Sequence, residues 1–78
     1  MPVTRKMLED EAAARFGRDS VKGVMALLDQ YKDKDPGRVQ MCILLLSKNI
    51  ADIKHNVSQA QMDYRDVLYW ADPNGTLI

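Results

Sequence analysis

Residues 41–46 read MCILLL, the longest uninterrupted apolar run in the chain. If this run is helical, Ile43 and Leu46 face one way, while Leu44 and Leu45 point in nearly the opposite direction. A helix that is apolar on every side is normally buried on every side. MCILLL therefore predicts a helix that other elements surround. Either the remaining helices of the same chain provide this cover, or a second copy does. We favour the second copy, because symmetric pairs are the commonest oligomers.

The apolar pattern of this run continues toward the C-terminus at alternating steps of four and three, a seven-residue repeat typical of packed helices. Its members are Val39, Ile43, Leu46, Ile50, Ile53, Val57, Ala60, Tyr64, Val67 and Ala71. Read without interruption, the repeat allows one helix over 37–71, on the order of 50 Å long. We favour a break near 47–49, because Asn49 can cap a new helix that has Asp52 at its third position. The two pieces can then fold against each other.

Two shorter helices are expected before this pair. Thr4 is a capping residue at the start of the first helix, and Gly17 suits the left-handed position after its end. The second helix, over about 20–31, carries apolar side chains at three- and four-residue steps. Asp35 then offers a capping carboxylate for the third helix. Pro36 is favourable at the first position of that helix, where its missing N–H costs nothing.

No second β-like run accompanies VQMCILLL, residues 39–46, so strands are not expected. We predict an all-α fold, a small bundle of three to four helices in which the last two form a helical hairpin. The helices are expected at about 5–16, 20–31, 36–47 and 49–71. The whole chain, 1–78, is expected to form a single helical domain with a short C-terminal tail at 73–78.

Composition argues against several functional classes. Eleven basic residues balance eleven acidic ones, so no net charge attracts nucleic acid or anionic lipid. Cys42 and His55 are the only residues of their types, too few for an internal disulfide or a four-ligand zinc site. The longest apolar run is far short of the roughly 20 residues that span a bilayer, and the N-terminal MPVTRKMLED lacks the apolar stretch of a signal sequence. We expect a cytoplasmic protein with no membrane association, metal or cofactor.

DYRDVLYWAD, residues 63–72, holds three of the five aromatic residues of the chain. Helical spacing places Tyr64 on the apolar stripe, whereas Tyr69 and Trp70 lie outside it. Since the core does not require this outer pair, and since tryptophan and arginine are favoured as anchors of protein interfaces, we interpret the segment as a docking face. A catalytic carboxylate pair needs two carboxyl groups in contrasting environments, and nothing in this pattern indicates such a contrast.

The two internal aspartates of this segment, Asp63 and Asp66, fall one helical turn apart on the same flank. Like charges at this spacing are mildly unfavourable, so a cation from another element should relieve them. Arg65 projects to a different side of a continuous helix. The expected cations are Arg5, Arg15 and Arg38, or the same residues of a partner subunit.

The segment D-Y-R-D-V-L-Y-W-A-D-P resembles the ending of small uncharacterised bacterial helical proteins, in which D-(aromatic)-R-D-V-L-x-x-A-E precedes a proline. Upstream, R-V-Q-M-C-I-L-L-L-S-K-N is similar to their preceding apolar helix, so the resemblance covers roughly residues 38–73. This chain differs in having Asp72 directly before Pro73, where an aromatic residue is expected between the acidic residue and the proline. The resemblance implies the helical pair and no activity.

These observations favour a helical protein that acts through protein–protein association and not as an enzyme. We expect it to associate with itself as a dimer, and a larger protein partner is the further candidate. A short chain buries only roughly 60–65% of its unfolded surface, and self-association commonly compensates for such a small core. The alternative is a small dimeric regulatory protein that binds nucleic acid, for which the only indication is the basic group Arg5, Lys6, Arg15, Arg18 and Lys22. The expected interface residues are Leu44, Leu45, Asp63, Tyr64, Asp66, Tyr69 and Trp70.

Overall fold

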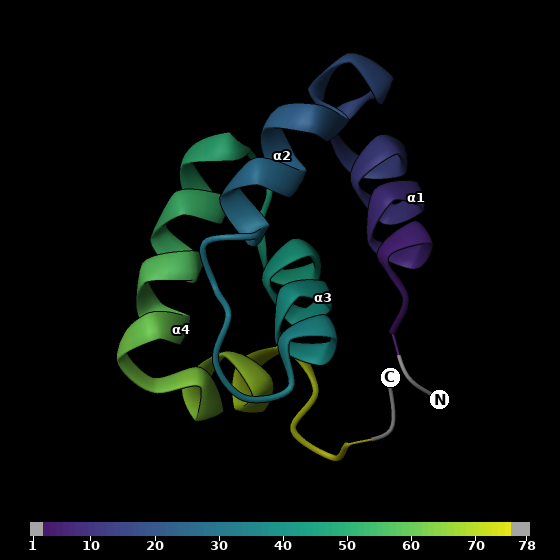
Figure 1. The fold of residues 1–78 in the computed structure, drawn as a ribbon. Helices are drawn as coiled ribbons and strands as arrows, with labels where there is room; N and C mark the ends of the chain where they lie inside the picture. The colour runs from purple at the N-terminus through teal and green to yellow at the C-terminus, as the bar shows by residue number, and fades with distance from the viewer. Residues whose placement is uncertain (1–2, 76–78) are drawn as a thin grey trace.

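The computed structural model describes residues 3–75 of the chain, which form four α-helices, one short 3₁₀ turn and no strand (Figure 1). The elements are α1 (Arg5–Phe16), η1 (Arg18–Ser20), α2 (Val21–Leu28), α3 (Pro36–Leu46) and α4 (Ile50–Ala71). The predicted all-α bundle is confirmed. Of the predicted tail, residues 73–75 follow α4 as a turn, in which Gly75 N–H donates to Asp72 O at 3.1 Å, and residues 76–78 lie outside the described part.

The apolar helix α3 lies at the centre of the bundle, between α1 on one side and α4 on the other, while α2 packs against both α1 and α4 (Figure 1). All residues from 39 to 44 are buried, and Leu45 and Leu46 are partly buried against the same core. The other helices of the same chain therefore provide most of the cover that MCILLL requires. A second copy is not needed to enclose this helix, which differs from the arrangement favoured by the sequence.

The chain breaks between α3 and α4, where the break was predicted. Asn49 Oδ1 accepts a hydrogen bond from Asp52 N–H at 2.9 Å, and Asp52 Oδ2 accepts one from Lys48 N–H at 2.9 Å. These bonds start a new helix at Ile50, so the chain folds back on itself as a hairpin. The described molecule extends 31 Å along its longest axis, which is too short for the continuous helix of about 50 Å that the uninterrupted repeat allowed.

Of the other capping signals, those at Thr4, Gly17 and Pro36 hold, and the one at Asp35 does not. Met7 N–H donates to Thr4 Oγ1 at 3.2 Å, and Gly17 follows α1 with a φ of 88°. Pro36 occupies the first position of α3. Asp35, however, has a left-handed backbone (φ 48°, ψ 57°), and its side chain makes no capping hydrogen bond. A capping side chain normally reaches its helix from an extended backbone, so the expected capping role of this carboxylate is wrong.

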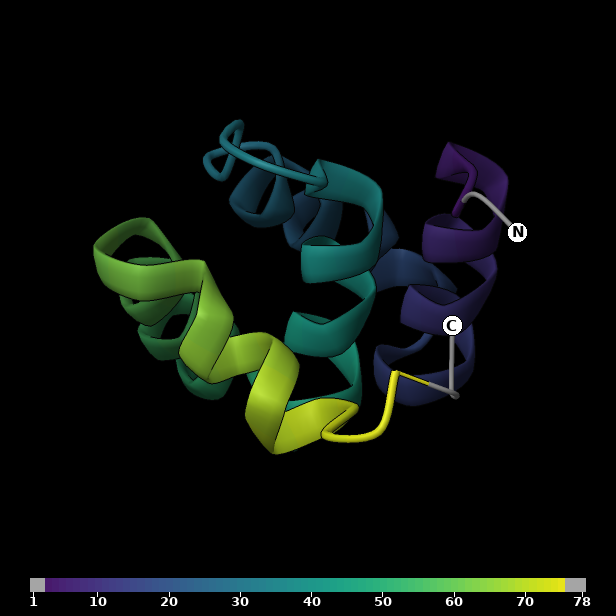
Figure 2. The ribbon, with the colours of Figure 1, turned by 90° about the horizontal axis from the view of Figure 1, so that it is seen from below.

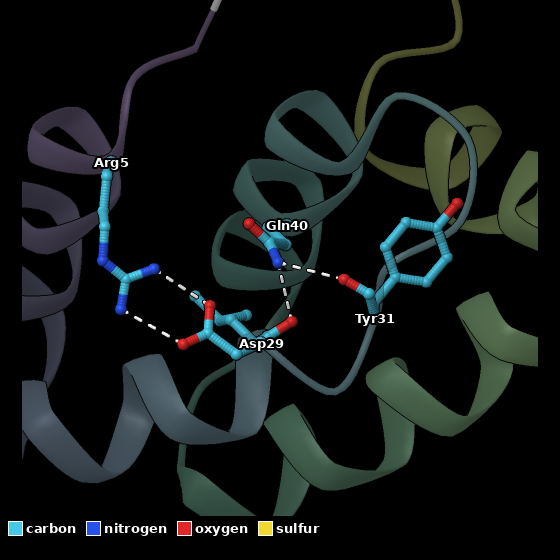
Figure 3. Close-up of polar contacts among 5 residues, drawn as sticks. Arg5, Asp29, Tyr31 and Gln40 are labelled. Carbon is cyan, nitrogen blue, oxygen red and sulfur yellow. Dashed lines mark hydrogen bonds and ion pairs between the residues drawn. The ribbon is translucent and has the colours of Figure 1, made fainter.

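The second helix ends at Leu28, three residues earlier than expected, and Gln40 of α3 stabilises this end (Figure 3). The last carbonyl groups of a helix have no partner within the helix. Gln40 Nε2 donates to Leu28 O at 2.7 Å and to Tyr31 O at 3.2 Å. Tyr31 is buried, and its hydroxyl donates to Lys34 O at 2.7 Å. Gln40 thus joins the central helix to the end of α2 and to the turn that follows it.

We expect Gln40→Leu to lower the free energy of unfolding by about 2 kcal/mol, because the substitution removes two buried hydrogen bonds but keeps the size of the side chain. Gln61→Leu is the matched control. Gln61 donates a single, exposed hydrogen bond to Gln30 O, and its loss should cost under about 0.5 kcal/mol. Urea denaturation followed by circular dichroism measures both. Equal midpoints for the two variants would contradict the role given to Gln40.

Candidate association surface

Asp63 interrupts α4 with an extended backbone (φ −156°, ψ 98°) and divides it into segments 50–62 and 64–71. The bend is visible from below, where the last turns of α4 leave the direction of its first part (Figure 2). Asp63 Oδ1 accepts hydrogen bonds from the backbone N–H and Nε of Arg65, both at 3.0 Å, and Oδ2 accepts one from Nη2 at 3.1 Å. Asp63 therefore caps the segment that follows it.

The hydrogen bonds from Arg65 hold the pKa of the Asp63 carboxyl below its ordinary value, and the same carboxylate raises the pKa of Arg65. The expectation that Arg65 cannot serve as the counter-ion of this segment is therefore wrong. It assumed a continuous helix, on which Arg65 and Asp63 face different sides. Once the backbone is extended at Asp63, the two side chains meet.

Asp66 also has a different partner from the one expected, because it accepts a hydrogen bond from Gln59 Nε2 at 3.1 Å. The three arginines named as candidate cations pair with other carboxylates. These pairs are Arg5–Asp29 at 2.9 Å, Arg15–Glu11 at 2.6 Å and Arg38–Asp72 at 3.3 Å. The bend was missed although it has a sequence signal, since an aspartate with an acidic residue three positions later is typical of a helix start.

The outer side of the bent segment carries the largest exposed aromatic groups of the described chain. Tyr69 is 69% exposed and Trp70 is 52% exposed, and Met62, just before the bend, is 81% exposed. On the inner side, Val67 is fully buried and Tyr64 packs against the core as a partly buried residue. The predicted division of these aromatics between core and surface is confirmed. We call Tyr69 and Trp70 the aromatic surface.

The predicted interface residues of α3 do not join the aromatic surface. Leu44 has no exposed area in the folded chain, so it cannot contact a partner, and its inclusion in the interface is corrected. Leu45 is partly buried against the core. The prediction treated both residues as belonging to a bare face of an apolar helix, whereas the other helices of the chain cover that face.

The end of α4 is fastened to the beginning of α3 by an ion pair between Arg38 and Asp72. Arg38 Nη2 lies 3.3 Å from Asp72 Oδ2. The Asp72 side chain is only 1% exposed, while that of Arg38 is 31% exposed. A buried carboxylate needs compensating hydrogen bonds or charge, so this pair holds the end of the bent segment at the first turn of α3.

The basic residues of α1 and α2 lie among carboxylates. Arg5, Arg18 and Lys22 share a hollow of about 440 Å³ between the two helices with Glu9 and Asp29. Arg5 donates two hydrogen bonds to the Asp29 carboxylate (Figure 3), which lower the pKa of Asp29. A nucleic-acid site requires a basic stripe that phosphates can approach, and the mixed charge of this hollow does not favour one.

Cys42 lies fully buried in α3, and burial raises the pKa of its thiol to about 11. A nucleophilic cysteine requires a thiolate and access to a substrate. Cys42 has neither at neutral pH, so it acts as a small core residue. Within residues 3–75, no group of three or more His, Cys, Asp or Glu side chains is arranged to hold a metal ion.

No protein-family model matches the chain, and neither a curated protein nor a solved structure is significantly similar to it. No helix within residues 3–75 combines the length and apolar character needed to cross a membrane.

Replacing Arg38 should destabilise the fold. We expect Arg38→Met to lower the free energy of unfolding by about 2 kcal/mol, less than the loss of a fully buried pair because Arg38 is partly exposed. Lys6→Met is the control, since Lys6 and Asp10 form an exposed pair worth at most a few tenths of a kcal/mol. Thermal unfolding measures both. An unchanged melting temperature for Arg38→Met would contradict the anchoring role.

The Cys42 thiol should resist alkylation in the folded protein. Because it is buried and protonated at neutral pH, we expect iodoacetamide to label it only as fast as the chain opens. Mass spectrometry follows the labelling, and a sample in urea provides the fully reactive control. Equal labelling rates in native buffer and in urea would show that the thiol is accessible.

Proposed function

We propose that this protein functions through protein–protein association, and that its aromatic surface binds the same surface of a second copy. The observation that carries the proposal is the exposure of Tyr69 and Trp70 on a segment whose opposite side is buried. Large aromatic side chains are enriched among the residues that dominate binding energy. Exposed in water, they leave apolar area that association would bury.

The charges around the aromatic surface support pairing between identical copies. A symmetric dimer brings the same patch of each subunit together, so the patch must complement itself. Arg65, Asp63 and Asp66 provide both signs of charge on the same short segment as Tyr69 and Trp70. The chain has no formal net charge, so two copies do not repel each other over long distance.

Self-association should depend on the aromatic surface. We expect the average mass of the purified protein to rise from 8.9 kDa toward twice that value with increasing concentration. The double variant Tyr69→Ser/Trp70→Ser should raise the dimer dissociation constant at least about tenfold, because it removes two central apolar anchors. Sedimentation equilibrium measures this change.

Two comparisons sharpen this test. Ile50→Ala removes an exposed apolar side chain at the start of α4 and should leave association unchanged. Trp70 is the only tryptophan, so its fluorescence should shift to shorter wavelength as the wild-type protein associates. A constant monomer mass with unchanged emission over the accessible concentrations would overturn the proposal.

A further inference from the structure

The bend at Asp63 interrupts α4 where the sequence would otherwise continue it. Neither a glycine nor a proline lies between residues 50 and 71, although these residues cause most sharp helix bends. The apolar stripe continues across the bend at regular spacing, through Ala60, Tyr64 and Val67. Locally, therefore, the chain is suited both to the bent form and to a continuous helix.

The bent form is held at its corner by two sets of hydrogen bonds. Asp63 caps the second segment through its bonds to Arg65, and Gln59 Nε2 donates to Asp66 across the bend. Beyond the corner, burial of Val67 and the Arg38–Asp72 ion pair attach the segment to the core. The burial of Val67 and the Arg38–Asp72 ion pair require only that the segment lies against α3. The α3 of a second copy could provide the same contacts.

In a continuous α4, the segment 64–71 would project about 12 Å beyond the bend at 1.5 Å per residue. Val67 would then leave the core of its own chain, and Asp72 would leave Arg38. A single chain would lose both contacts. A second copy that opened in the same way could supply both, because it would present an identical vacant position over its own α3.

We propose that Asp63 is a hinge at which residues 64–75 open from their own chain and close over α3 of a second copy, which returns its own segment. Exchange of an identical element between protomers reproduces the contacts of the closed chain, so it is a low-cost route to a dimer. The two chains gain a continuous α4 and lose the cap at Asp63 and the Gln59–Asp66 hydrogen bond. This exchange is distinct from the pairing of aromatic surfaces, since Tyr69 and Trp70 take part neither in the hydrogen bonds at the bend nor in the packing of the core.

Cross-linking shows which chain the segment covers. In a Cys42→Ala background, Arg38→Cys and Asn74→Cys place thiols at the start of α3 and in the turn beside it, where Gly75 approaches the Arg38 side chain. Arg38→Cys removes the ion pair with Asp72 from the closed and the exchanged forms alike, so the burial of Val67 holds the segment in both and neither form is favoured. A short bis-maleimide then joins the two thiols. A closed chain yields an internal link and monomer mass on a denaturing gel, whereas exchanged chains yield linked dimers.

Asp63→Ala, made in this background, removes the cap of the second segment of α4. Asp63→Asn is the control, because asparagine caps a helix about as well as aspartate. We expect the linked-dimer fraction of Asp63→Ala to be roughly fivefold higher than that of Asp63→Asn. Exclusively internal links in Asp63→Ala, at every protein concentration, would overturn the proposal. Circular dichroism monitors folding, and an exchanged dimer retains the helical signal.

A second pair of variants tests the hinge even if Asp63→Ala is poorly folded. Tyr64→Pro places proline at the first position after the bend, where it suits the bent form but prevents a continuous helix. Added to Asp63→Ala, it should abolish linked dimers, whereas Tyr64→Ala, which loses the same side-chain packing, should not. Equal yields of linked dimer from Asp63→Ala/Tyr64→Pro and Asp63→Ala/Tyr64→Ala would overturn the proposed hinge at Asp63.

The Tyr69→Ser/Trp70→Ser variant separates this inference from the proposed function. If both are correct, it weakens association of the wild-type chain and leaves the linked dimers of Asp63→Ala intact. Loss of those linked dimers in the combined variant would show that they arise from the aromatic surface, and would overturn the exchange.

Discussion

The structure depends on one constraint, the enclosure of a helix that is apolar on every side. In a chain of 78 residues, enclosing α3 engages almost all of the remaining secondary structure, with α1 and α4 against it and α2 closing the gap between them. The polar groups that this arrangement buries must find partners. Gln40 serves the end of α2, while Asn56 donates to Ser47, whose hydroxyl in turn donates to Ile43 O. The core is thus tied together by a few buried hydrogen bonds of side chains, made to backbone carbonyls and to one another.

The bend at Asp63 follows from the same constraint. A straight α4 would pass the beginning of α3 and leave that end of the core uncovered. By bending, the chain places Val67 in the core and brings Asp72 to Arg38, 34 residues earlier in the sequence. Tyr69 and Trp70 lie on the opposite side of this segment from Val67 and are exposed. The position of the surface proposed for association therefore depends on how the chain closes its own core.

Much of the candidate site could be read from the sequence, but its geometry could not. The separation of Tyr64 from Tyr69 and Trp70 follows from helical spacing, which holds within each segment of α4. The ionic partners were misjudged because the spacing argument assumed that the helix continued through Asp63. Leu44 was misjudged for another reason. Periodicity shows that a side is apolar, but it does not show whether the same chain or a second chain covers that side.

By itself, the sequence determined the helical class and most of the helix ends. The break at Asn49 and the caps at Thr4 and Gly17 depend on bonds and backbone preferences that span about one helical turn, so local residues specify them. Only the tertiary structure decided what encloses α3, which carboxylate each arginine meets, and whether α4 bends. These outcomes join residues far apart in the chain. The local sequence of α4 suits both a bent and a continuous helix, and the burial gained at one end of the core selects the bent form.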